Sequence, residues 1–222
     1  MSDIVYSPGE DVFLVVLLDG NVYLSGQGNI EVKMKFTQPQ GGVSRVVWID
    51  QVSGDFLTAS PKAGVLRIYN AALPHHKEII KVSKYGIKDL VRMSRDIYLI
   101  KLKNGQIIQY NVRTKKTLFT SDVAHTHQIQ KTLVHPEDKY IISSVGYDGS
   151  LRLWNLRNME LESQFEDRKA TEMDSVIQTI AWCKIPKRKN KDYSNLLAMG
   201  TRGGLVKLVD LHRNRVVSVF NI

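Results

Sequence analysis

Cysteine is almost absent from this sequence, since Cys183 is the one cysteine among 222 residues. An intrachain disulfide framework and a Cys-rich zinc module are therefore excluded. Long apolar runs are also missing: the longest, Val12 to Leu18, ends after seven residues, whereas a membrane-spanning helix needs about 18. The first residues include Asp3 and lack a basic segment followed by an apolar one, so we expect no signal peptide. The absence of any Asn-x-Ser/Thr sequence is compatible with a reducing, intracellular compartment.

The composition is that of a folded globular protein. Hydrophobic residues make up 43% of the chain and charged residues 24%, which argues against gross disorder. Lysine and arginine outnumber aspartate and glutamate by 31 to 22, which gives a formal net charge of +9. The length allows one domain or two small ones.

A repeated pattern organises the chain. A turn dipeptide that ends in glycine precedes a strand of alternating residues and then an aromatic residue or its substitute. The five dipeptides are Asp19-Gly20, Ala63-Gly64, Asn104-Gly105, Asp148-Gly149 and Gly203-Gly204. Their glycines are separated by 44, 41, 44 and 55 residues, and the longest interval contains a polar insertion. Copies of about 40–45 residues match the period of a four-stranded propeller blade.

Each copy predicts four strands. Asp-Gly and Asn-Gly between two apolar runs are strong hairpin signals, because both residues can adopt positive φ. The segment from Glu160 to Met173 holds no 3.6-residue period, so we predict no helix there. In the second copy, the strands are expected at residues 43–49, 56–60, 65–70 and 78–82. Regular strands without intervening helices favour an antiparallel all-β fold.

We therefore predict a single β-propeller segment over residues 1–222, with about five four-stranded antiparallel blades. The blades are expected at residues 1–36, 43–83, 87–120, 125–166 and 175–222. Three arrangements remain open: a compact five-bladed ring, an open arc, or a ring completed by missing sequence or another chain. We favour an open or incomplete propeller, in which exposed edge strands would need to be covered.

The fourth copy resembles a WD repeat. Ala124-His125 stands where that family has Gly-His, Asp148-Gly149 matches its turn, and Trp154-Asn155 matches its Trp-Asp pair. The resemblance implies a buried structural hydrogen-bond network formed by His125, Ser144, Asp148 and Trp154. In the other copies Tyr69, Tyr110 or Val209 replaces the tryptophan, so those blades are expected to depend on apolar packing.

Two longer stretches, residues 43–70 and 135–156, resemble consecutive blades of the family of WD repeat-containing protein 17. That family is a large intracellular scaffold with two propellers followed by helical repeats. The resemblance implies that this chain is an interior piece of a larger propeller and a non-catalytic scaffold for protein–protein interaction. It also implies a cytoplasmic location, and analogy with other scaffolds of this type suggests an association with cilia.

Catalysis and metal binding have weaker support. His125, Ser144 and Asp148 are the residue types of a nucleophilic triad, but Ser144 falls within a predicted strand and not at a nucleophile elbow, so a hydrolase is the less favoured alternative. His75 and His76 would point to opposite faces of a strand. His125 and His127 lack an acid or a cysteine at ligand spacing. The Gly-rich segments 26–28 and 41–42 lack a following helix and a lysine, so they do not predict a phosphate site. We therefore expect no catalytic residue, metal or cofactor.

The insertion in the fifth copy is strongly basic. Its basic residues, which we call the basic loop, are Lys184, Lys187, Arg188, Lys189 and Lys191. This loop suggests an alternative function, the binding of RNA or an acidic partner, against the simpler interpretation of a solvated loop between two strands. Nucleic acid is disfavoured because Tyr193 is the one aromatic residue beside the loop. We expect other proteins as partners.

Overall fold

The computed structural model describes residues 3–7, 12–17, 19–26, 32–36, 42–49, 53–121, 125–126, 129–158, 160–167, 172–183 and 196–221. Contacts between residues divide the chain into two compact units. Unit 1 comprises Met1–Lys103 with Ile107–Thr120, and unit 2 comprises Asn104–Gln106 with Ser121–Ile222. The prediction that residues 1–222 form one propeller segment stays a prediction.

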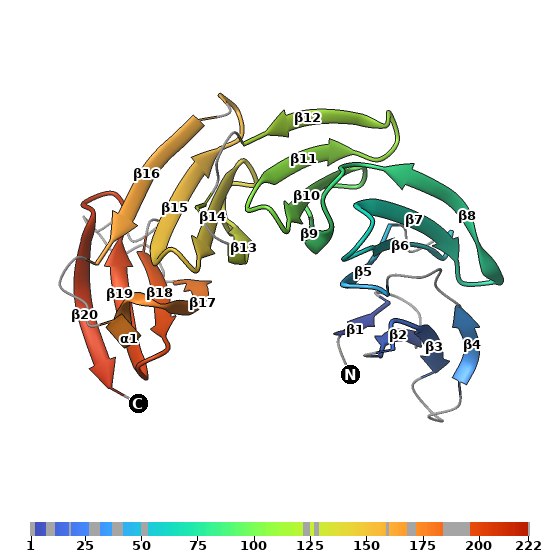
Figure 1. Ribbon diagram of the computed structural model, residues 1–222, viewed down its shortest axis with the longest axis horizontal. Helices are drawn as coiled ribbons and strands as arrows, with labels where there is room; N and C mark the ends of the chain where they lie inside the picture. Colours follow the sequence, from blue (N-terminus) through green and yellow to red (C-terminus); the bar gives the residue numbers. More distant parts are fainter. Residues whose placement is uncertain are drawn as a thin grey trace. The chain divides into compact units, whose positions relative to one another are not determined.

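Unit 1 contains three four-stranded sheets, which we call blades 1, 2 and 3 (Figure 1). Blade 1 consists of β1 (Asp3–Tyr6), β2 (Val12–Val16), β3 (Val22–Gly26) and β4 (Val32–Phe36). Blade 2 consists of β5 (Arg45–Trp48), β6 (Asp55–Ala59), β7 (Val65–Asn70) and β8 (Leu73–Lys81). Blade 3 consists of β9 (Ile87–Arg92), β10 (Ile97–Leu102), β11 (Ile107–Asn111) and β12 (Lys116–Thr120).

Unit 2 contains blades 4 and 5 and one short helix (Figure 1). Blade 4 consists of β13 (Ile129–Val134), β14 (Ile141–Gly146), β15 (Ser150–Asn155) and β16 (Glu160–Glu166). Blade 5 consists of β17 (Ile177–Trp182), β18 (Leu196–Thr201), β19 (Leu205–Asp210) and β20 (Arg215–Asn221), and it is preceded by α1 (Glu172–Ser175). In all five blades, neighbouring strands follow chain order and pair antiparallel. Five four-stranded antiparallel sheets are thus confirmed.

The turn glycines explain the repeat. Each one lies between the second and third strands of its blade and has a positive φ, and these glycines are Gly20 (84°), Gly64 (61°), Gly105 (85°), Gly149 (73°) and Gly204 (88°). A side chain is disfavoured in this backbone region, whereas glycine adopts it readily. The recurring glycine therefore marks the central hairpin of every blade.

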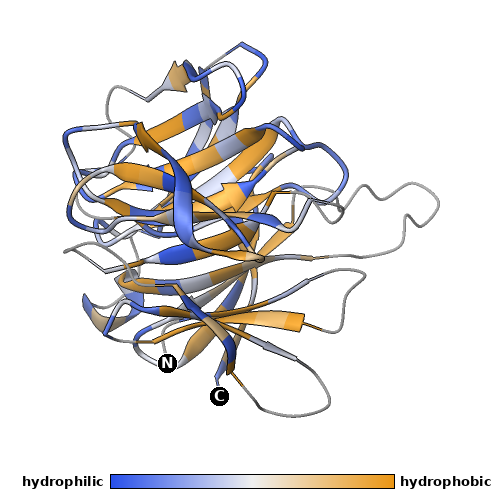
Figure 2. Ribbon diagram, turned by 90° about the vertical axis from the view of Figure 1, so that its right-hand side faces the viewer, coloured by the Kyte–Doolittle hydropathy of each residue, from blue (hydrophilic) through white to orange (hydrophobic). Residues whose placement is uncertain are grey.

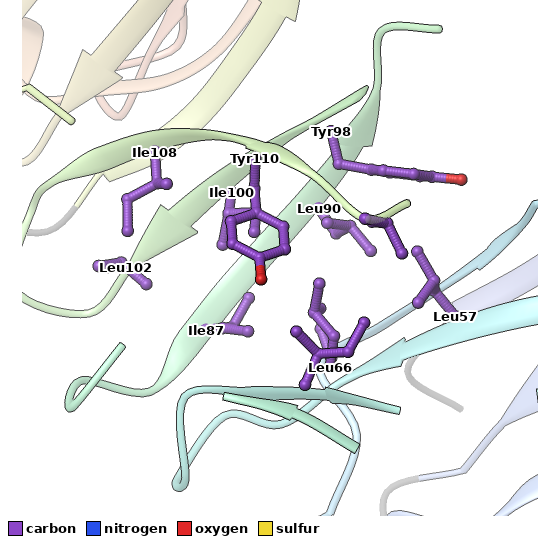
Figure 3. Packing of buried hydrophobic residues seen from close by; sticks show 12 residues of the cluster. Leu57, Leu66, Ile87, Leu90, Tyr98, Ile100, Leu102, Ile108 and Tyr110 are labelled. Atoms are coloured by element: carbon purple, nitrogen blue, oxygen red, sulfur yellow. The ribbon is translucent and has the colours of Figure 1, made fainter. Parts of the chain in front are cut away.

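The hydrophobic core lies between successive blades of the same unit. In unit 1, one apolar cluster joins Leu57 and Leu66 of blade 2 to Ile87, Ile100 and other residues of blade 3 (Figure 3). Tyr69 belongs to a second cluster, shared with blade 1. Leu66 and Tyr69 are three residues apart on β7 and therefore point to opposite faces, so one strand supplies both interfaces. A third cluster joins blades 4 and 5 in unit 2.

The fourth strand of each blade is its most exposed. β8 begins at Leu73, whereas the sequence predicted this strand from Glu78, five residues later. The prediction began too late because the first residues of β8 are exposed and show no apolar alternation that would reveal a strand. β7 and β8 change register at Ile68/Tyr69 and Tyr69/Asn70. Figure 2 shows hydrophobic colour along many strands, and hydrophilic colour on turns and on parts of some strands.

The prediction of no helix from Glu160 to Met173 was wrong at the end of that segment. Residues Glu172–Ser175 form the single helical turn α1, in which Ser175 Oγ donates a hydrogen bond to the carbonyl oxygen of Glu172 at 2.8 Å. Four residues are too few to show a helical period, so the pattern could not reveal it. Within the described ranges, no helix has the length and apolarity to cross a bilayer.

Candidate functional site

Four side chains of blade 4 form a continuous hydrogen-bonded chain. The indole Nε1 of Trp154 donates to Ser144 Oγ at 2.9 Å, and Ser144 Oγ lies 2.8 Å from His125 Nε2. His125 Nδ1 lies 3.0 Å from Asp148 Oδ1. The residues come from β14, β15, the turn between them and the segment before β13. The structure thus brings together all four residues that the WD-repeat resemblance implies, and we call them the blade 4 network.

Asp148 is the acceptor at the end of this network. Its carboxylate also accepts hydrogen bonds from the backbone amides of Ser150 and Thr126, both at 3.1 Å, and from Ser150 Oγ at 2.8 Å. Burial by itself would raise the pKa of Asp148, but the hydrogen bond and charge of His125 and the donors of Ser150 hold this pKa well below its ordinary value of 3.8. The carboxylate is therefore charged over the whole physiological range.

The network has the order of a catalytic triad but lacks an accessible nucleophile. Ser144 is 0% exposed and His125 only 2% exposed. The indole N–H of Trp154 occupies a lone pair of Ser144 Oγ, and His125 Nε2 lies 2.8 Å from the same oxygen. A Cβ atom at Gly146 would lie 2.6 Å from His125 Nδ1, so backbone closes this side of the imidazole. Ser144 is therefore buried, whereas a nucleophilic serine must be reached by its substrate.

Blades 2, 3 and 5 place other residues at the position of Trp154. Tyr69, Tyr110 and Val209 are each buried in the apolar clusters between blades. Tyr69 packs against Phe56 with ring centroids 5.4 Å apart and an interplanar angle of 11°. Apolar packing therefore occupies this position where the tryptophan is replaced.

A row of charged side chains follows the first strands of the blades. Asp3, Arg45 and Asp89 occupy the same register position of β1, β5 and β9. Each of them pairs with a residue of the second strand of its blade. That second-strand residue pairs in turn with the second residue after the turn glycine. Arg45 Nη1 lies 2.9 Å from Asp3 Oδ1, and Arg45 Nε lies 2.6 Å from Asp89 Oδ1. One arginine therefore joins three blades of unit 1.

A buried lysine completes this row in unit 1. Lys101 is 2% exposed, and its Nζ lies 2.7 Å from Asp89 Oδ2. Burial alone would raise the pKa of Asp89, but Lys101 and Arg45 hold it below its ordinary value of 3.8. In unit 2 the same register position carries Lys131 and Thr179, whose Nζ and Oγ1 atoms are 3.1 Å apart. This row cannot be recognised in the sequence, because its members are dozens of residues apart and are brought together only by the alignment of the strands.

An open hollow lies at one rim of blade 4. It has a volume of about 460 Å³ and is formed by the loop between β13 and β14 together with Arg157 of the next hairpin. Arg157 makes two hydrogen bonds with Asp138, at 2.7 and 3.0 Å, and its Cζ lies 4.6 Å from the centre of the Tyr140 ring. His135 Nδ1 accepts hydrogen bonds from the amides of Glu137 and Asp138, which fixes the loop. The hollow thus presents an aromatic ring and a guanidinium on a rigid support.

Several predicted features lie outside the described residues. They are the basic loop (residues 184–191), His127, Gly41 and residues 27 and 28, so binding of RNA or an acidic partner by the basic loop stays a prediction. Among the residues that the structure describes, no group of three or more His, Cys, Asp or Glu side chains could hold a metal ion. Cys183 is half-buried, and burial raises its pKa, which disfavours the reactive thiolate.

Comparison with solved structures supports the architecture. The crystal structure of the computationally designed Ika8 protein is similar to this chain, with a TM-score of 0.72 and 14% sequence identity. The chain has a repeated β-blade fold. The match covers 98% of this chain and 60% of the designed chain, and at this identity it concerns the fold alone. No family model matches the sequence of this β-blade protein.

The blade 4 network leads to a prediction on stability and pH. We expect Asp148→Ala to lower the free energy of unfolding by about 1–3 kcal/mol at neutral pH, because buried donors lose their acceptor. The pKa of the folded-state carboxyl is depressed below 3.8, so its stabilisation is present above about pH 4 and is lost as the pH falls further. Urea unfolding of wild type and variant in steps from about pH 7 to about pH 3 should therefore show a difference that shrinks in acid.

Glu172→Gln is the control for this experiment, because Glu172 is exposed in α1. It should leave the free energy of unfolding unchanged at neutral pH. A difference between wild type and Asp148→Ala that stays constant down to about pH 3 would contradict the assignment of the depressed pKa to Asp148.

Proposed function

We propose that this β-blade protein is a non-catalytic protein–protein interaction scaffold of the WD-repeat type. The observation that supports the proposal most directly is the closure of the blade 4 network, in which Trp154 donates to a serine that is 0% exposed. Side chains sealed in this way rigidify a blade and leave its rim free for binding. A cytoplasmic location, with the ciliary association suggested by analogy, belongs to the same proposal, as does kinship with the family of WD repeat-containing protein 17.

The hollow at the rim of blade 4 is the surface that we assign to docking. Tyrosine and arginine are the residue types that most often dominate the energy of protein interfaces, and here Tyr140 and Arg157 lie against each other. Asp138 fixes the guanidinium through two hydrogen bonds, so little side-chain entropy remains to be lost on binding. The rim also carries Glu137 and Lys139, which can pair with charges at the edge of an interface.

The experiment compares wild type with the double variant Tyr140→Ala/Arg157→Ala. Proteins cross-linked to the wild-type chain in cells are identified, and each purified candidate is titrated against both forms. Loss of two anchors should weaken a true partner by about 30-fold or more in Kd, which corresponds to about 2 kcal/mol. Arg113→Ala is the matched control, because Arg113 lies eight residues after Gly105 just as Arg157 lies eight residues after Gly149.

The control variant should bind its partner with unchanged affinity. Two results would overturn the proposal. One is that every recovered protein binds the double variant as tightly as wild type, with both forms folded. The other is turnover of a generic ester or phosphoester substrate that His125→Ala abolishes while the variant remains folded.

A further inference from the structure

Three blades carry a cationic side chain at the same position of the third strand. Arg67, Arg152 and Lys207 are each the third residue after the turn glycine, namely Gly64, Gly149 and Gly204. They lie on β7, β15 and β19 and pair with residues of the second strand in equivalent register. Equal register in equivalent strands directs their side chains to equivalent faces of the three blades.

Two of these three cations have an acidic neighbour. Lys207 is 3% exposed, and its Nζ lies 2.8 Å from Asp167 Oδ2. Arg152 Nη2 lies 3.8 Å from Asp148 Oδ2. Ion pairing of this kind is the usual condition under which a charged side chain is buried.

Arg67 differs from the other two. It is 5% exposed, and its Nε and Nη1 atoms are buried without a hydrogen-bond partner among the described residues. The four acids that form ion pairs in the described part of unit 1 do so with other cations: Asp3, Asp55, Glu78 and Asp89. In the part of unit 1 that the structure describes, the guanidinium therefore has buried donors and no acid paired with it.

The sequences that precede Arg67 and Lys207 differ in charge. In blade 4, Phe165 pairs with the second residue after the turn glycine. Two residues after Phe165 comes Asp167, which forms the ion pair with Lys207 of blade 5. In blade 1, Phe36 has the same register, since it pairs with Val22. Two residues after Phe36 the sequence has Gln38, and the segment 37–41 contains no acidic residue. Two residues after the corresponding phenylalanine, the sequence is thus acidic before blade 5 and uncharged before blade 2.

We propose that Arg67 is the binding site for an oxyanion, either a phosphate group or a carboxylate, between blades 1 and 2 of unit 1. A buried cation is costly unless an anion accompanies it, and guanidinium groups bind the oxygens of phosphate and carboxylate through several N–H donors. The bound anion takes the place that Asp167 holds beside Lys207 in blade 5. This site is independent of the proposed docking function, because it lies in another unit from the hollow of blade 4.

The experiment measures the melting temperature of wild type and Arg67→Met at constant ionic strength in chloride, phosphate and acetate. Phosphate stabilises many proteins by exclusion from their surface, and this general effect appears equally in both forms. Specific binding should raise the melting temperature of wild type alone, by about 5 °C or more when the anion reaches roughly 100 times its Kd. A response to phosphate but not acetate identifies a phosphate group, and a response to both extends the site to carboxylates.

Lys207→Met is the matched control, because Lys207 already has Asp167 as its anion. This variant should be destabilised in all three salts and should retain the specific response of wild type. A direct measurement accompanies the melts: the Nε–H signal of Arg67 in wild-type protein should shift and saturate on titration with inorganic phosphate or acetate, which does not require the variant to fold. An equal response of wild type and Arg67→Met to all three salts, or an unchanged Nε–H signal, means that water alone solvates the guanidinium and overturns the proposal.

Discussion

Asp89→Ala should destabilise unit 1 more than removal of any surface charge. The substitution leaves Lys101 buried, with 2% exposure, and without the carboxylate that lies 2.7 Å from its ammonium. Breaking a buried ion pair by removing one partner typically costs about 3–5 kcal/mol, because an uncompensated charge remains in the interior. Chemical denaturation followed by far-ultraviolet circular dichroism should show this loss in the free energy of unfolding at neutral pH.

The double variant Asp89→Ala/Lys101→Met separates charge burial from loss of packing. It removes both buried charges, and Arg45, whose side chain is 41% exposed, keeps Asp3 and water as partners. We therefore expect the double variant to recover most of the stability lost in Asp89→Ala. A double variant less stable than the single one, or a loss below about 1 kcal/mol in Asp89→Ala, would show that the ion pair is not the source of the effect.

The hairpins could be predicted from sequence because local chemistry determines them. Glycine at a position of positive φ and alternating residues on either side are signals within about ten residues of each other. β7 accordingly begins and ends at the residues expected, Val65 and Asn70. In blade 4 the resemblance to a WD repeat also indicated four polar side chains, and the structure brings these together in one hydrogen-bonded chain.

The charged row could not be predicted, because it depends on how separate blades stack. Arg45 and Asp89 are 44 residues apart and meet only because β5 and β9 lie side by side. Lys101 lies within the apolar strand β10. Lysine is almost never fully buried unless it is paired, so sequence alone places this side chain at the surface. Burial of Arg67 could not be predicted for the same reason, since an arginine within a strand is ordinarily assigned to the solvent.

Phe56→Ala should lower the free energy of unfolding by about as much as Asp89→Ala does, through a different mechanism. Phe56 is 0% exposed and lies at the centre of an aromatic cluster between blades 1 and 2. Its ring centroid is 5.0 Å from Phe36, 5.6 Å from Trp48 and 5.4 Å from Tyr69. Truncation removes buried apolar surface and leaves a cavity among rings that cannot close in without losing their own contacts, at a cost of about 3–5 kcal/mol.

Phe56→Leu is the control, because leucine keeps an apolar side chain in most of the space, and it should cost clearly less than alanine. Denaturation measures both losses, and the fluorescence of Trp48, which is 5% exposed, should shift to longer wavelength in native Phe56→Ala as water reaches the cavity.

The two large predictions also test different features of the same interfaces. Raising the salt concentration should change the effect of Asp89→Ala, through screening of the remaining charges, but leave that of Phe56→Ala nearly unaltered. The aromatic cluster and the charged row occupy separate positions, so the stacking of blades 1, 2 and 3 should have separate apolar and ionic contributions. Equal salt dependence of the two variants would contradict this separation.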